Sequence, residues 1–341
     1  MTAVRTCLRR PACTLLLLAA ALLAPLPAAL AFDLQGHRGA RGLAPENTLP
    51  GFAKALSIGV HTLETDIAIS RDGVLLISHD SALNPDITRG PDGQWLAARG
   101  PVIFHTPAAE LQRYDVGRLK PGSRYAGQFP EQQAVDGARL PTLAALLDLV
   151  KRAGNPPAGH APVRLALETK LNPNTPDDTV APEPFARALI TAVRDAGLAT
   201  RVSILSFDWR TLAVVQREAP EIPTVYLTAR QRWLDNVGNG PVSPWTAGLA
   251  LRDHGGSVPK MIHAAGGKVW SSFHGDLDMA QVKEAQALGL QVLAWTVNEP
   301  AQIEAMLDLG VDGIVSDRPD RVRDVMARRG MPLPAPLAVA P

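Results

Sequence analysis

From residue 32 onward, short apolar runs alternate with longer segments in which apolar residues recur at helical spacing. The short runs predict strands, and the longer periodic segments predict helices. This alternation is typical of βα units that build a parallel sheet. The predicted strands are Asp33–Gly36, Thr62–Ile69, Val163–Thr169, Val202–Phe207, Thr224–Leu227, Lys268–Ser271, Gln291–Trp295 and Gly313–Ser316. The predicted helices are Pro50–Ser57, Thr142–Ala153, Pro184–Ala196, Trp209–Ala219, Asp278–Leu288 and Pro300–Leu309.

Eight such strands favour an α/β fold of the (β/α)8 TIM-barrel class, built by residues 32–330 as a single domain. A further apolar stretch, Gly248–Leu251, is interpreted as part of a loop. Residues 81–139 follow the strand Val74–Ser78, which is expected to pair with the second barrel strand as a hairpin, and they show little helical period. We expect them to form an insertion over the barrel mouth, because loops of this length are usually functional or disordered. The Pro/Ala-rich tail 331–341 has no periodicity and is expected to be flexible.

The first 31 residues have the pattern of a cleavable signal peptide. Three arginines precede the apolar run Leu15–Leu23, and Ala29-Leu30-Ala31 provides the small-x-small pattern of a cleavage site. The apolar run is shorter than the roughly 20 residues that a membrane-spanning helix needs. The sequence therefore predicts export to the periplasm or the medium, with no stable membrane anchor.

Charge and cysteine content argue against nucleic-acid binding and against cysteine chemistry. Removing the signal takes away three of the 34 basic residues and none of the 33 acidic ones, which leaves 31 against 33, a net charge of −2. Such a chain has no basic field for nucleic acid. Cys7 and Cys13 both lie in the predicted signal. We therefore expect no disulfide, no thiolate nucleophile and no cysteine metal ligand in the mature protein.

Alternation along two predicted strands places acidic side chains together inside the barrel. In Thr62–Ile69 the odd positions suit the helix-covered outside, so Glu64 and Asp66 share the inner face, about 7 Å apart along the strand. By the same alternation, Glu168 and Lys170 point inward at the end of the third strand. Desolvated like charges repel each other, so these carboxylates stay ionised only beside cations.

Two interpretations of this acidic cluster remain open. Three carboxylates from two strands form an oxygen-rich site that suits Ca²⁺ or Mg²⁺ better than zinc. Alternatively, the acids form a structural salt-bridge cluster with Arg38 and Lys170, since buried ion networks also perturb acids.

Histidine and arginine follow the strand ends near this cluster. His37 and Arg38 follow the first strand, and His79 ends the hairpin strand. The planar guanidinium of arginine suits a phosphate, and two histidines could serve as the base and the acid of phosphodiester cleavage. Each histidine alone is more often a hydrogen-bonded core residue.

Three further residues carry two interpretations each. Asn47 could cap the first helix, a role that Thr48 could also fill, or contact the active site. Glu46 could be a fourth metal ligand or could orient a ligand. Trp295 ends a strand at the catalytic face of a barrel, where it could also serve core packing. The chain has neither a P-loop nor a Gly-x-Ser-x-Gly elbow, which argues against P-loop and serine-hydrolase chemistry.

In this order, the motifs resemble those of the glycerophosphodiester phosphodiesterases across nearly the whole mature chain. They are Gly36-His37-Arg38-Gly39, Pro45-Glu46-Asn47-Thr48, Glu64-Thr65-Asp66, Asp72-Gly73, His79-Asp80, Leu140-Pro141-Thr142-Leu143, Glu168-Thr169-Lys170, Ser206-Phe207, Trp295-Thr296-Val297-Asn298, Gly310-Val311-Asp312-Gly313-Ile314 and Ser316-Asp317. The resemblance implies a barrel enzyme that uses Ca²⁺ or Mg²⁺ to hydrolyse deacylated glycerophospholipids to an alcohol and sn-glycerol 3-phosphate.

The resemblance also assigns roles to residues at the matching positions. It implies acid/base histidines at His37 and His79, and an aromatic wall of the glycerol pocket at Trp295. It further implies metal-binding acids at Glu64, Asp66 and Glu168, and phosphate-contacting cations at Arg38 and Lys170.

Two other functions remain as alternatives. A lysophospholipase D or sphingomyelinase D-like enzyme would need an apolar patch at the barrel mouth, and residues 81–139 offer only scattered aromatics. A non-catalytic periplasmic binder of glycerophosphodiesters would be suggested by loss of a histidine or a metal acid, and none is missing. The sequence does not define an oligomeric state.

Overall fold

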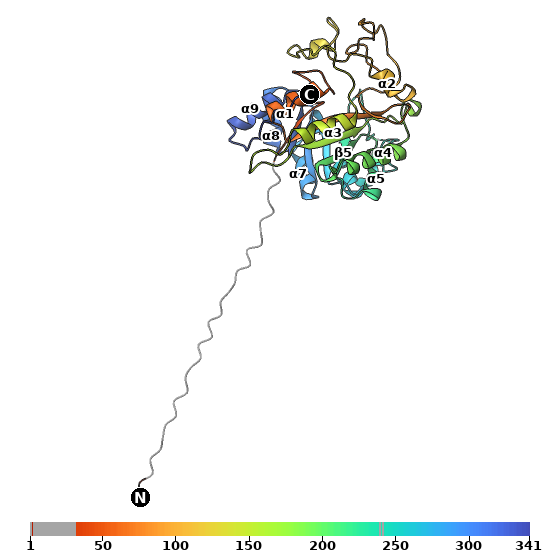
Figure 1. Cartoon of the computed structure of the whole chain (residues 1–341). Helices are drawn as coiled ribbons and strands as arrows, with labels where there is room; N and C mark the ends of the chain where they lie inside the picture. The colour runs from red at the N-terminus through yellow and green to blue at the C-terminus, as the bar shows by residue number, and fades with distance from the viewer. Residues whose placement is uncertain (1, 3–31, 239, 241) are drawn as a thin grey trace. The chain divides into compact units, whose positions relative to one another are not determined.

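The computed structural model describes residues 2, 32–238, 240 and 242–341, so the predicted signal peptide lies almost wholly outside the described residues. The strands are β1 (Asp33–Gly36), β2 (Thr62–Ile69), β3 (Leu75–Ile77), β4 (Arg164–Thr169), β5 (Val202–Ser206), β6 (Thr224–Thr228), β7 (Val269–Phe273), β8 (Gln291–Trp295) and β9 (Gly313–Ser316). The helices are α1 (Leu49–Ile58), α2 (Ala108–Leu111), α3 (Leu143–Arg152), α4 (Pro182–Asp195), α5 (Trp209–Glu218), α6 (Val258–Ala264), α7 (Met279–Ala287), α8 (Pro300–Leu309) and α9 (Pro319–Arg328). Figure 1 labels several of them.

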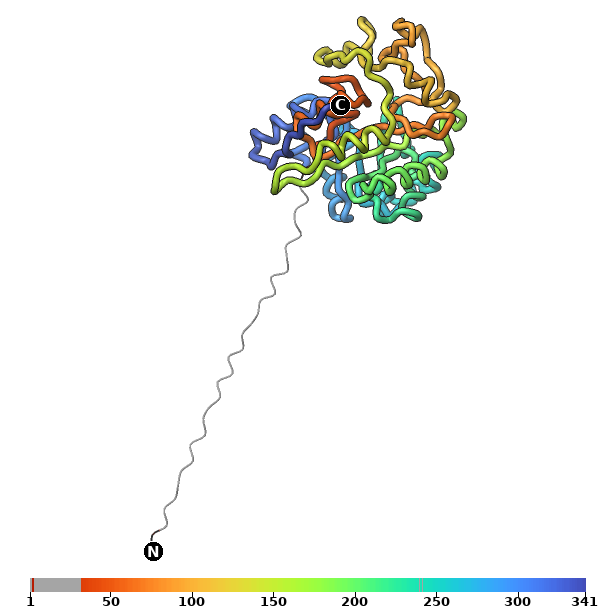
Figure 2. The backbone as a smooth tube through the Cα atoms, in the orientation of Figure 1, coloured from red at the N-terminus to blue at the C-terminus, as the bar shows by residue number. Residues whose placement is uncertain are grey.

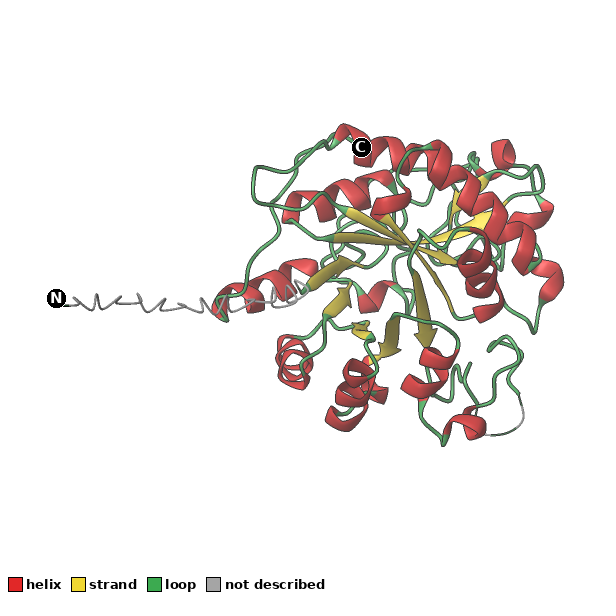
Figure 3. Ribbon diagram, turned by 90° about the horizontal axis from the view of Figure 1, so that it is seen from below, coloured by secondary structure: helices red, strands yellow, loops and turns green. Residues whose placement is uncertain are grey.

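The strands close into a barrel. Their order is β1-β9-β8-β7-β6-β5-β4-β2-β3, and an additional β1–β2 pairing joins the ends of the parallel series. Among the strands of the described residues, β3 alone runs antiparallel to its neighbour; it pairs with β2 and forms the predicted hairpin. The α-helices surround the strands (Figure 3). The predicted (β/α)8 TIM barrel, with an insertion after the second-strand hairpin, is therefore confirmed.

Strand alternation separates an outer core from the barrel interior. Along β2 all eight residues are buried; Leu63 and Ile67 belong to the large core that the helices cover, as predicted for the odd positions. A smaller cluster, which includes Leu205 and Leu293, fills the interior. The polar side chains Glu64 and Asp66 are buried as well. Packing thus leaves the carboxylates of β2 on the same side of the sheet as the smaller cluster.

Three helices, α2, α6 and α9, are missing from the sequence prediction; α2 spans only four residues of the insertion. The segment that precedes α6 contains a 3₁₀ turn at Leu251–His254, which agrees with the interpretation of Gly248–Leu251 as loop. The α6 helix spans only seven residues, too few to show a clear period. The α9 helix begins at Pro319 and is strongly charged, so its apolar positions Val322, Val325 and Met326 are the only signal of a buried face.

The insertion, residues 81–139, packs on the barrel as an irregular segment with its own small core. It contains α2 and two 3₁₀ turns, Ile103–His105 and Ala126–Gln128. Its apolar side chains, among them Ile103 and Leu111, form a cluster with residues of β2 and β3. Figure 2 shows this segment, orange to yellow, beside the red-orange loop that follows β1. The insertion therefore reaches the end of the barrel where the strands finish.

The C-terminal tail is packed, which corrects the prediction of a flexible tail. The backbone N–H of Leu337 donates to the carbonyl of Leu56, 2.8 Å away, and the Leu337 side chain is buried. Arg323 donates to the carbonyl of Pro334, and Arg152 donates to the carbonyl of Ala340. The tail gives no periodic signal because it has no regular structure, yet these side chains and its own apolar residues hold it against α1, α3 and α9.

Replacing Leu337 by alanine is expected to lower the free energy of unfolding by about 2 kcal/mol, the low end for a buried leucine, because a terminal segment can partly close the cavity. Urea unfolding of the wild type and the variant measures this difference. The matched control is Ala338→Ser, an exposed neighbour. Equal unfolding free energies for Leu337→Ala and the control would contradict the packed tail.

Among the residues that the structure describes, each helix is too short or too polar to cross a membrane.

Candidate active site

Three buried carboxylates meet at the carboxyl ends of two neighbouring strands. Glu64 and Asp66 lie on β2, Glu168 lies on β4, and the parallel register sets Asp66 directly opposite Glu168. One oxygen of each side chain lies within 4.8 Å of the others. All three side chains are buried. The prediction that these acids converge inside the barrel is therefore confirmed, and we call them the acidic triad.

Electrostatics indicate that the acidic triad lacks positive charge. Burial, then Asp66 and Glu168, raises the pKa of Glu64 well above its usual range. Burial, together with Asp66, raises the pKa of Glu168 to about 7 even though Lys170 opposes the rise. The pKa of Asp66 is lowered, because Arg38 and Lys170 outweigh its burial. Arg38 and Lys170 therefore neutralise the charge of Asp66. They leave the negative charge of ionised Glu64 and Glu168 without enough positive charge nearby.

The residues present fit a hard divalent cation. Oxygen ligands from carboxylates are what Ca²⁺ and Mg²⁺ prefer. Asp66 Oδ1 is buried and accepts no hydrogen bond within the described part of the chain, and Lys170 Nζ stands 3.6 Å from it. A cation held by Glu64, Asp66 and Glu168 would occupy the centre that these charges leave uncompensated. An ion-pair network with Arg38 and Lys170 is also present, so the two interpretations of the cluster are compatible.

Two cations approach the acidic triad from strand ends. Arg38 follows β1; its Nε lies 3.3 Å from Asp66 Oδ2, and its NH1 donates to Glu46 Oε1 at 2.9 Å. Lys170 follows β4, and its Nζ donates to Glu168 Oε1 at 2.9 Å. Glu46 therefore lies against Arg38 rather than in the triad. It orients a cation, and the hydroxyl of Tyr125 from the insertion donates to its other oxygen.

A tight turn after β1 sets the position of Arg38. Arg38 and Asn47 both have left-handed backbone conformations, with φ of 50° and 54°. The N–H of Asn47 donates to the carbonyl of Arg38, and the N–H of Arg38 donates to Glu64 Oε2. Asn47 Nδ2 donates to Asp66 Oδ2 at 2.9 Å, whereas the helix cap is Thr48. Of the two predicted roles of Asn47, the structure therefore places it in the site.

His37 is held by a carboxylate from the opposite end of the chain. Its Nδ1 lies 2.6 Å from Asp317 Oδ1, and its Nε2 lies 3.8 Å from Glu64 Oε2. Asp317 also accepts hydrogen bonds from Arg41 and from Asn298. Burial and then Arg41 lower the pKa of His37 to about 4, although Asp317 opposes the fall. The imidazole is thus neutral at pH 7, with Nδ1–H on Asp317 and Nε2 available as an acceptor.

His79 forms a similar pair with its neighbour. Its Nδ1 lies 2.7 Å from Asp80 Oδ1, and Asn84 donates to the other oxygen of Asp80. Burial, then Arg38, lowers the pKa of His79. His79 and Asp80 also line a small cavity of about 30 Å³ with Glu46 and Asn47. The two histidines therefore approach the acidic triad from the ends of different strands, each with its Nδ1 on a carboxylate.

Aromatic side chains border the same mouth. Trp295 ends β8; its indole N–H donates to the carbonyl of Ser271, and its ring meets that of Phe207 edge to face. Phe273 and Trp233 pack on the other sides of Trp295, with ring centroids 5.6 and 6.1 Å away. We call these four residues the aromatic ridge. Trp295 therefore lies at the catalytic face, as predicted, and is only partly buried.

Sequence reasoning gave no role to Asp317, Arg41, Asn298 or Tyr125. Asp317 is separated from His37 by 280 positions along the chain, so spacing could not pair them. A usable signal existed for Asp317: an acidic residue directly after the last barrel strand lies at the catalytic face. Tyr125 had no such signal, because it lies in an insertion without a period.

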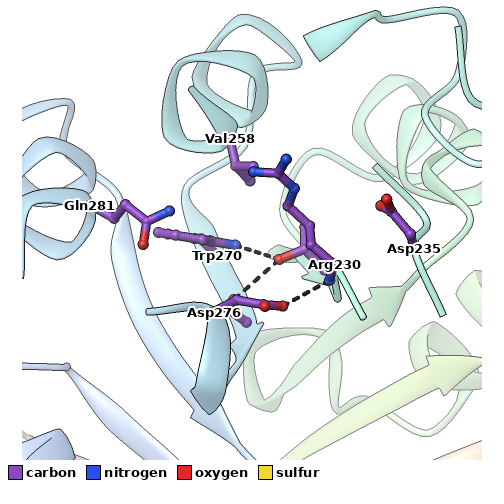
Figure 4. A pocket seen from close by; sticks show the side chains of 8 residues that line it. Arg230, Asp235, Val258, Trp270, Asp276 and Gln281 are labelled. Atoms are coloured by element: carbon purple, nitrogen blue, oxygen red, sulfur yellow. Dashed lines mark hydrogen bonds between the residues drawn. The ribbon is translucent and has the colours of Figure 1, made fainter. Parts of the chain in front are cut away.

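A larger cavity, of about 260 Å³, lies between the outer side of β6 and β7 and the helices α6 and α7 (Figure 4). The indole N–H of Trp270 donates to Thr228 Oγ1 there, and the N–H of Arg230 donates to Asp276. None of the site residues above lines it. Trp270 and Arg230 thus each donate to another residue of the cavity lining.

The fold and site define an enzyme of the parallel-barrel class, with acids, cations and two His–Asp pairs at the carboxyl ends of the strands. The sequence pattern of the "Glycerophosphoryl diester phosphodiesterase family" matches residues 37–321. The chain therefore belongs to that family of enzymes.

Individual relatives agree with this assignment. The chain is 24% identical, over 294 residues, to a glycerophosphodiester phosphodiesterase of Caldanaerobacter subterraneus subsp. tengcongensis, covering 86% of this chain and 97% of that one. A crystal structure from Silicibacter pomeroyi DSS-3, named for the same activity, is 36% identical with a TM-score of 0.76, covering 88% and 95% of the two chains. An Oleispira antarctica phosphodiesterase in complex with its product sn-glycerol-3-phosphate shares the fold, with 22% identity, a TM-score of 0.62 and coverage of 86% and 96%.

Proposed function

We propose that the protein hydrolyses glycerophosphodiesters, the deacylated phospholipids, to an alcohol and sn-glycerol 3-phosphate. The observation that carries the proposal is the convergence of the acidic triad, Arg38, Lys170 and two His–Asp pairs at one barrel end. Family membership supports the same reaction, and so does the product bound by the Oleispira antarctica relative of the same fold. A binder without catalysis would have no need of two histidines whose Nε2 atoms are left available.

The charges of the site suit a phosphodiester anion. Arg38 offers a guanidinium, and Lys170 a compact ammonium, to non-bridging phosphate oxygens. Glu64, Asp66 and Glu168 would hold a divalent cation, Ca²⁺ or Mg²⁺, which when bound polarises a phosphoryl oxygen and offsets charge that develops in the transition state. Asn47 and Glu46 keep Asp66 and Arg38 in place for this contact.

The histidines move the protons. One imidazole takes the proton of the nucleophile, water or the glycerol 2-hydroxyl, as its oxygen bonds to phosphorus. The other histidine protonates the alcohol oxygen as the P–O bond to it breaks. If the 2-hydroxyl attacks, a cyclic phosphate forms and is then opened by water. Asp317 and Asp80 fix Nδ1–H on each ring, so Nε2 exchanges the proton in both cases.

The direct test is turnover of glycerophosphocholine and glycerophosphoethanolamine, with sn-glycerol 3-phosphate measured as the product. Production of sn-glycerol 3-phosphate is expected from both diesters. Tight binding of the diesters without turnover would instead favour the non-catalytic binder.

Replacing Asp317 by asparagine is expected to lower kcat by about 10²- to 10⁴-fold, because the carboxylate that orients His37 and stabilises its imidazolium is lost. Since a negative charge beside His37 raises its pKa, the variant's imidazole should be less basic. The pKa of His37 in the variant falls further, so a limb of the pH profile that reports this base moves to lower pH. Kinetics across pH measure both changes. A loss of kcat without any shift of the pH profile would indicate a structural role for Asp317 only.

The export of the protein is part of the proposal. Residues 1–31 support it by their signal-peptide pattern. Mass spectrometry of the protein recovered from cells should find a mature chain that begins at Phe32. A full-length chain confined to the cytosol would contradict it.

A further inference from the structure

The insertion contacts the active site through the side chain of Tyr125. The Tyr125 hydroxyl donates to Glu46 Oε2 and accepts a hydrogen bond from Arg41 NH1, 3.1 Å away. Both partners are nearly covered, because the side chain of Glu46 is 6% exposed and that of Arg41 is 11% exposed. Tyr125 therefore lies between an acid and a cation that belong to two different parts of the site.

The acid connects Tyr125 to the cation that is proposed to bind the phosphate. Glu46 Oε1 accepts from Arg38 NH1 at 2.9 Å, and Arg38 Nε lies 3.3 Å from Oδ2 of Asp66 in the acidic triad. One oxygen of Glu46 is thus bound to the tyrosine and the other to the guanidinium. Because the hydroxyl restricts rotation of this carboxylate, the position of Arg38 depends on a residue of the insertion.

The cation connects Tyr125 to the histidine that is proposed to move a proton. Arg41 Nε donates to Asp317 Oδ1 at 2.8 Å, and Arg41 NH2 donates to Asp317 Oδ2 at 3.1 Å. Asp317 Oδ1 in turn lies 2.6 Å from His37 Nδ1. The planar guanidinium therefore binds Asp317 with two groups and the tyrosine with the third, which fixes the carboxylate that orients His37.

Tyr125 itself is held by its neighbours in the insertion. Its ring meets that of Phe129 edge to face at 5.3 Å, and the guanidinium carbon of Arg41 lies 4.7 Å from the centroid of the buried Phe129 ring. The side-chain amide of Gln132 donates to the backbone carbonyl of Arg41 at 2.7 Å. Burial, then Glu46, raises the pKa of Tyr125, so the hydroxyl keeps the proton that it donates.

We propose that Tyr125 is a positioning residue of the reaction. Its hydroxyl fixes Arg38 through Glu46, and it fixes His37 through Arg41 and the carboxylate that Arg41 binds. The inference rests on the proposed phosphodiesterase activity and adds to it a residue that acts through other side chains of the site. Cleavage needs the phosphate and the proton-transferring group in one alignment, so a small displacement of either one lowers the rate of the bound substrate.

The test is Tyr125→Phe, which removes the hydroxyl and keeps the ring. The variant's kcat for glycerophosphocholine is expected to fall about tenfold, the lower end for a hydrogen bond to a charged group. KM should stay within about twofold, as for an interaction that is realised mainly in the transition state. Choline release at varied substrate concentration measures both constants. The matched control is Tyr114→Phe, the same change at a tyrosine that packs against the insertion's own core, and it should keep the wild-type kcat.

A second background tests the route through Glu46. In Glu46→Gln the amide has a single acceptor oxygen, which Arg38 takes, so the Tyr125 hydroxyl loses its carboxylate. Adding Tyr125→Phe to this variant is expected to lower kcat further by only about threefold, because residues of one hydrogen-bond network are not additive. The same tenfold loss in both backgrounds would overturn the inference, since Tyr125 would then not act through Glu46.

The outcomes separate this inference from the proposed function. Turnover by the wild type with an unchanged kcat in Tyr125→Phe would overturn the inference alone. So would a loss of kcat that is accounted for by the unfolded fraction of Tyr125→Phe, measured by circular dichroism at the assay temperature. Absence of glycerophosphodiester turnover by the wild type would overturn the proposed function, and the inference with it.

Discussion

Replacing either His37 or His79 by alanine is expected to lower kcat by about 10²- to 10⁴-fold, the usual contribution of a positioned acid or base. Each imidazole is fixed through Nδ1 by a carboxylate, so Nε2 is the atom that exchanges a proton. Alanine removes that atom and leaves the acidic triad and both cations in place. Choline release from glycerophosphocholine under saturating conditions measures the loss.

A matched control and a second substrate sharpen this prediction. His105→Ala removes an exposed histidine of the insertion and should keep the wild-type rate. A glycerophosphodiester with a p-nitrophenol leaving group needs little protonation, so the variant that lacks the acid should regain much of its rate on it. The variant that lacks the base should not. Rates like the wild type in both His37→Ala and His79→Ala would refute the acid/base assignment.

The barrel was predictable because its strands carry a local signal. In a strand with helices on one face and polar groups on the other, apolar and polar side chains alternate from one residue to the next. This alternation predicts from sequence alone that Glu64, Asp66 and Glu168 point into the barrel. The structure adds the register that sets Asp66 opposite Glu168. The alternation of residues within one strand therefore determines which acids face inward. The register between neighbouring strands determines which of these acids lie next to each other.

The supporting contacts were not predictable, because they join distant positions through side chains. Asp317 meets His37 only when β9 closes the barrel beside β1. Tyr125 meets Glu46 only through an irregular insertion. The packed tail is similar, since Leu337 finds Leu56 without any regular structure of its own. Periodicity reports one element at a time, and these contacts exist only between elements.

The acidic triad has fewer cations than acids around it, because Arg38 and Lys170 are the two cations for Glu46 and the three triad carboxylates. Arg38 divides its contacts between Glu46 and Asp66, and Lys170 divides its own between Asp66 and Glu168. Buried carboxylates that lack a partner are costly, and a bound cation would relieve that cost. The salt-bridge interpretation and the metal interpretation therefore make different predictions about what happens when Ca²⁺ or Mg²⁺ is removed.

Replacing Asp66 by asparagine is expected to weaken Ca²⁺ or Mg²⁺ binding and to lower kcat about 10³-fold, since a metal ion supplies several kcal/mol of transition-state stabilisation. Isothermal titration calorimetry of the chelator-treated protein measures binding directly, and a rise in the melting temperature on adding the ion reports it without activity. Asp148→Asn, an exposed acid on α3, is the matched control and should bind as the wild type does. Chelated wild-type protein should lose activity and regain it with one of the two ions. Full activity after chelation, together with no heat and no thermal shift on adding either ion, would leave Glu64, Asp66 and Glu168 as an ion-pair network that positions Arg38 and Lys170.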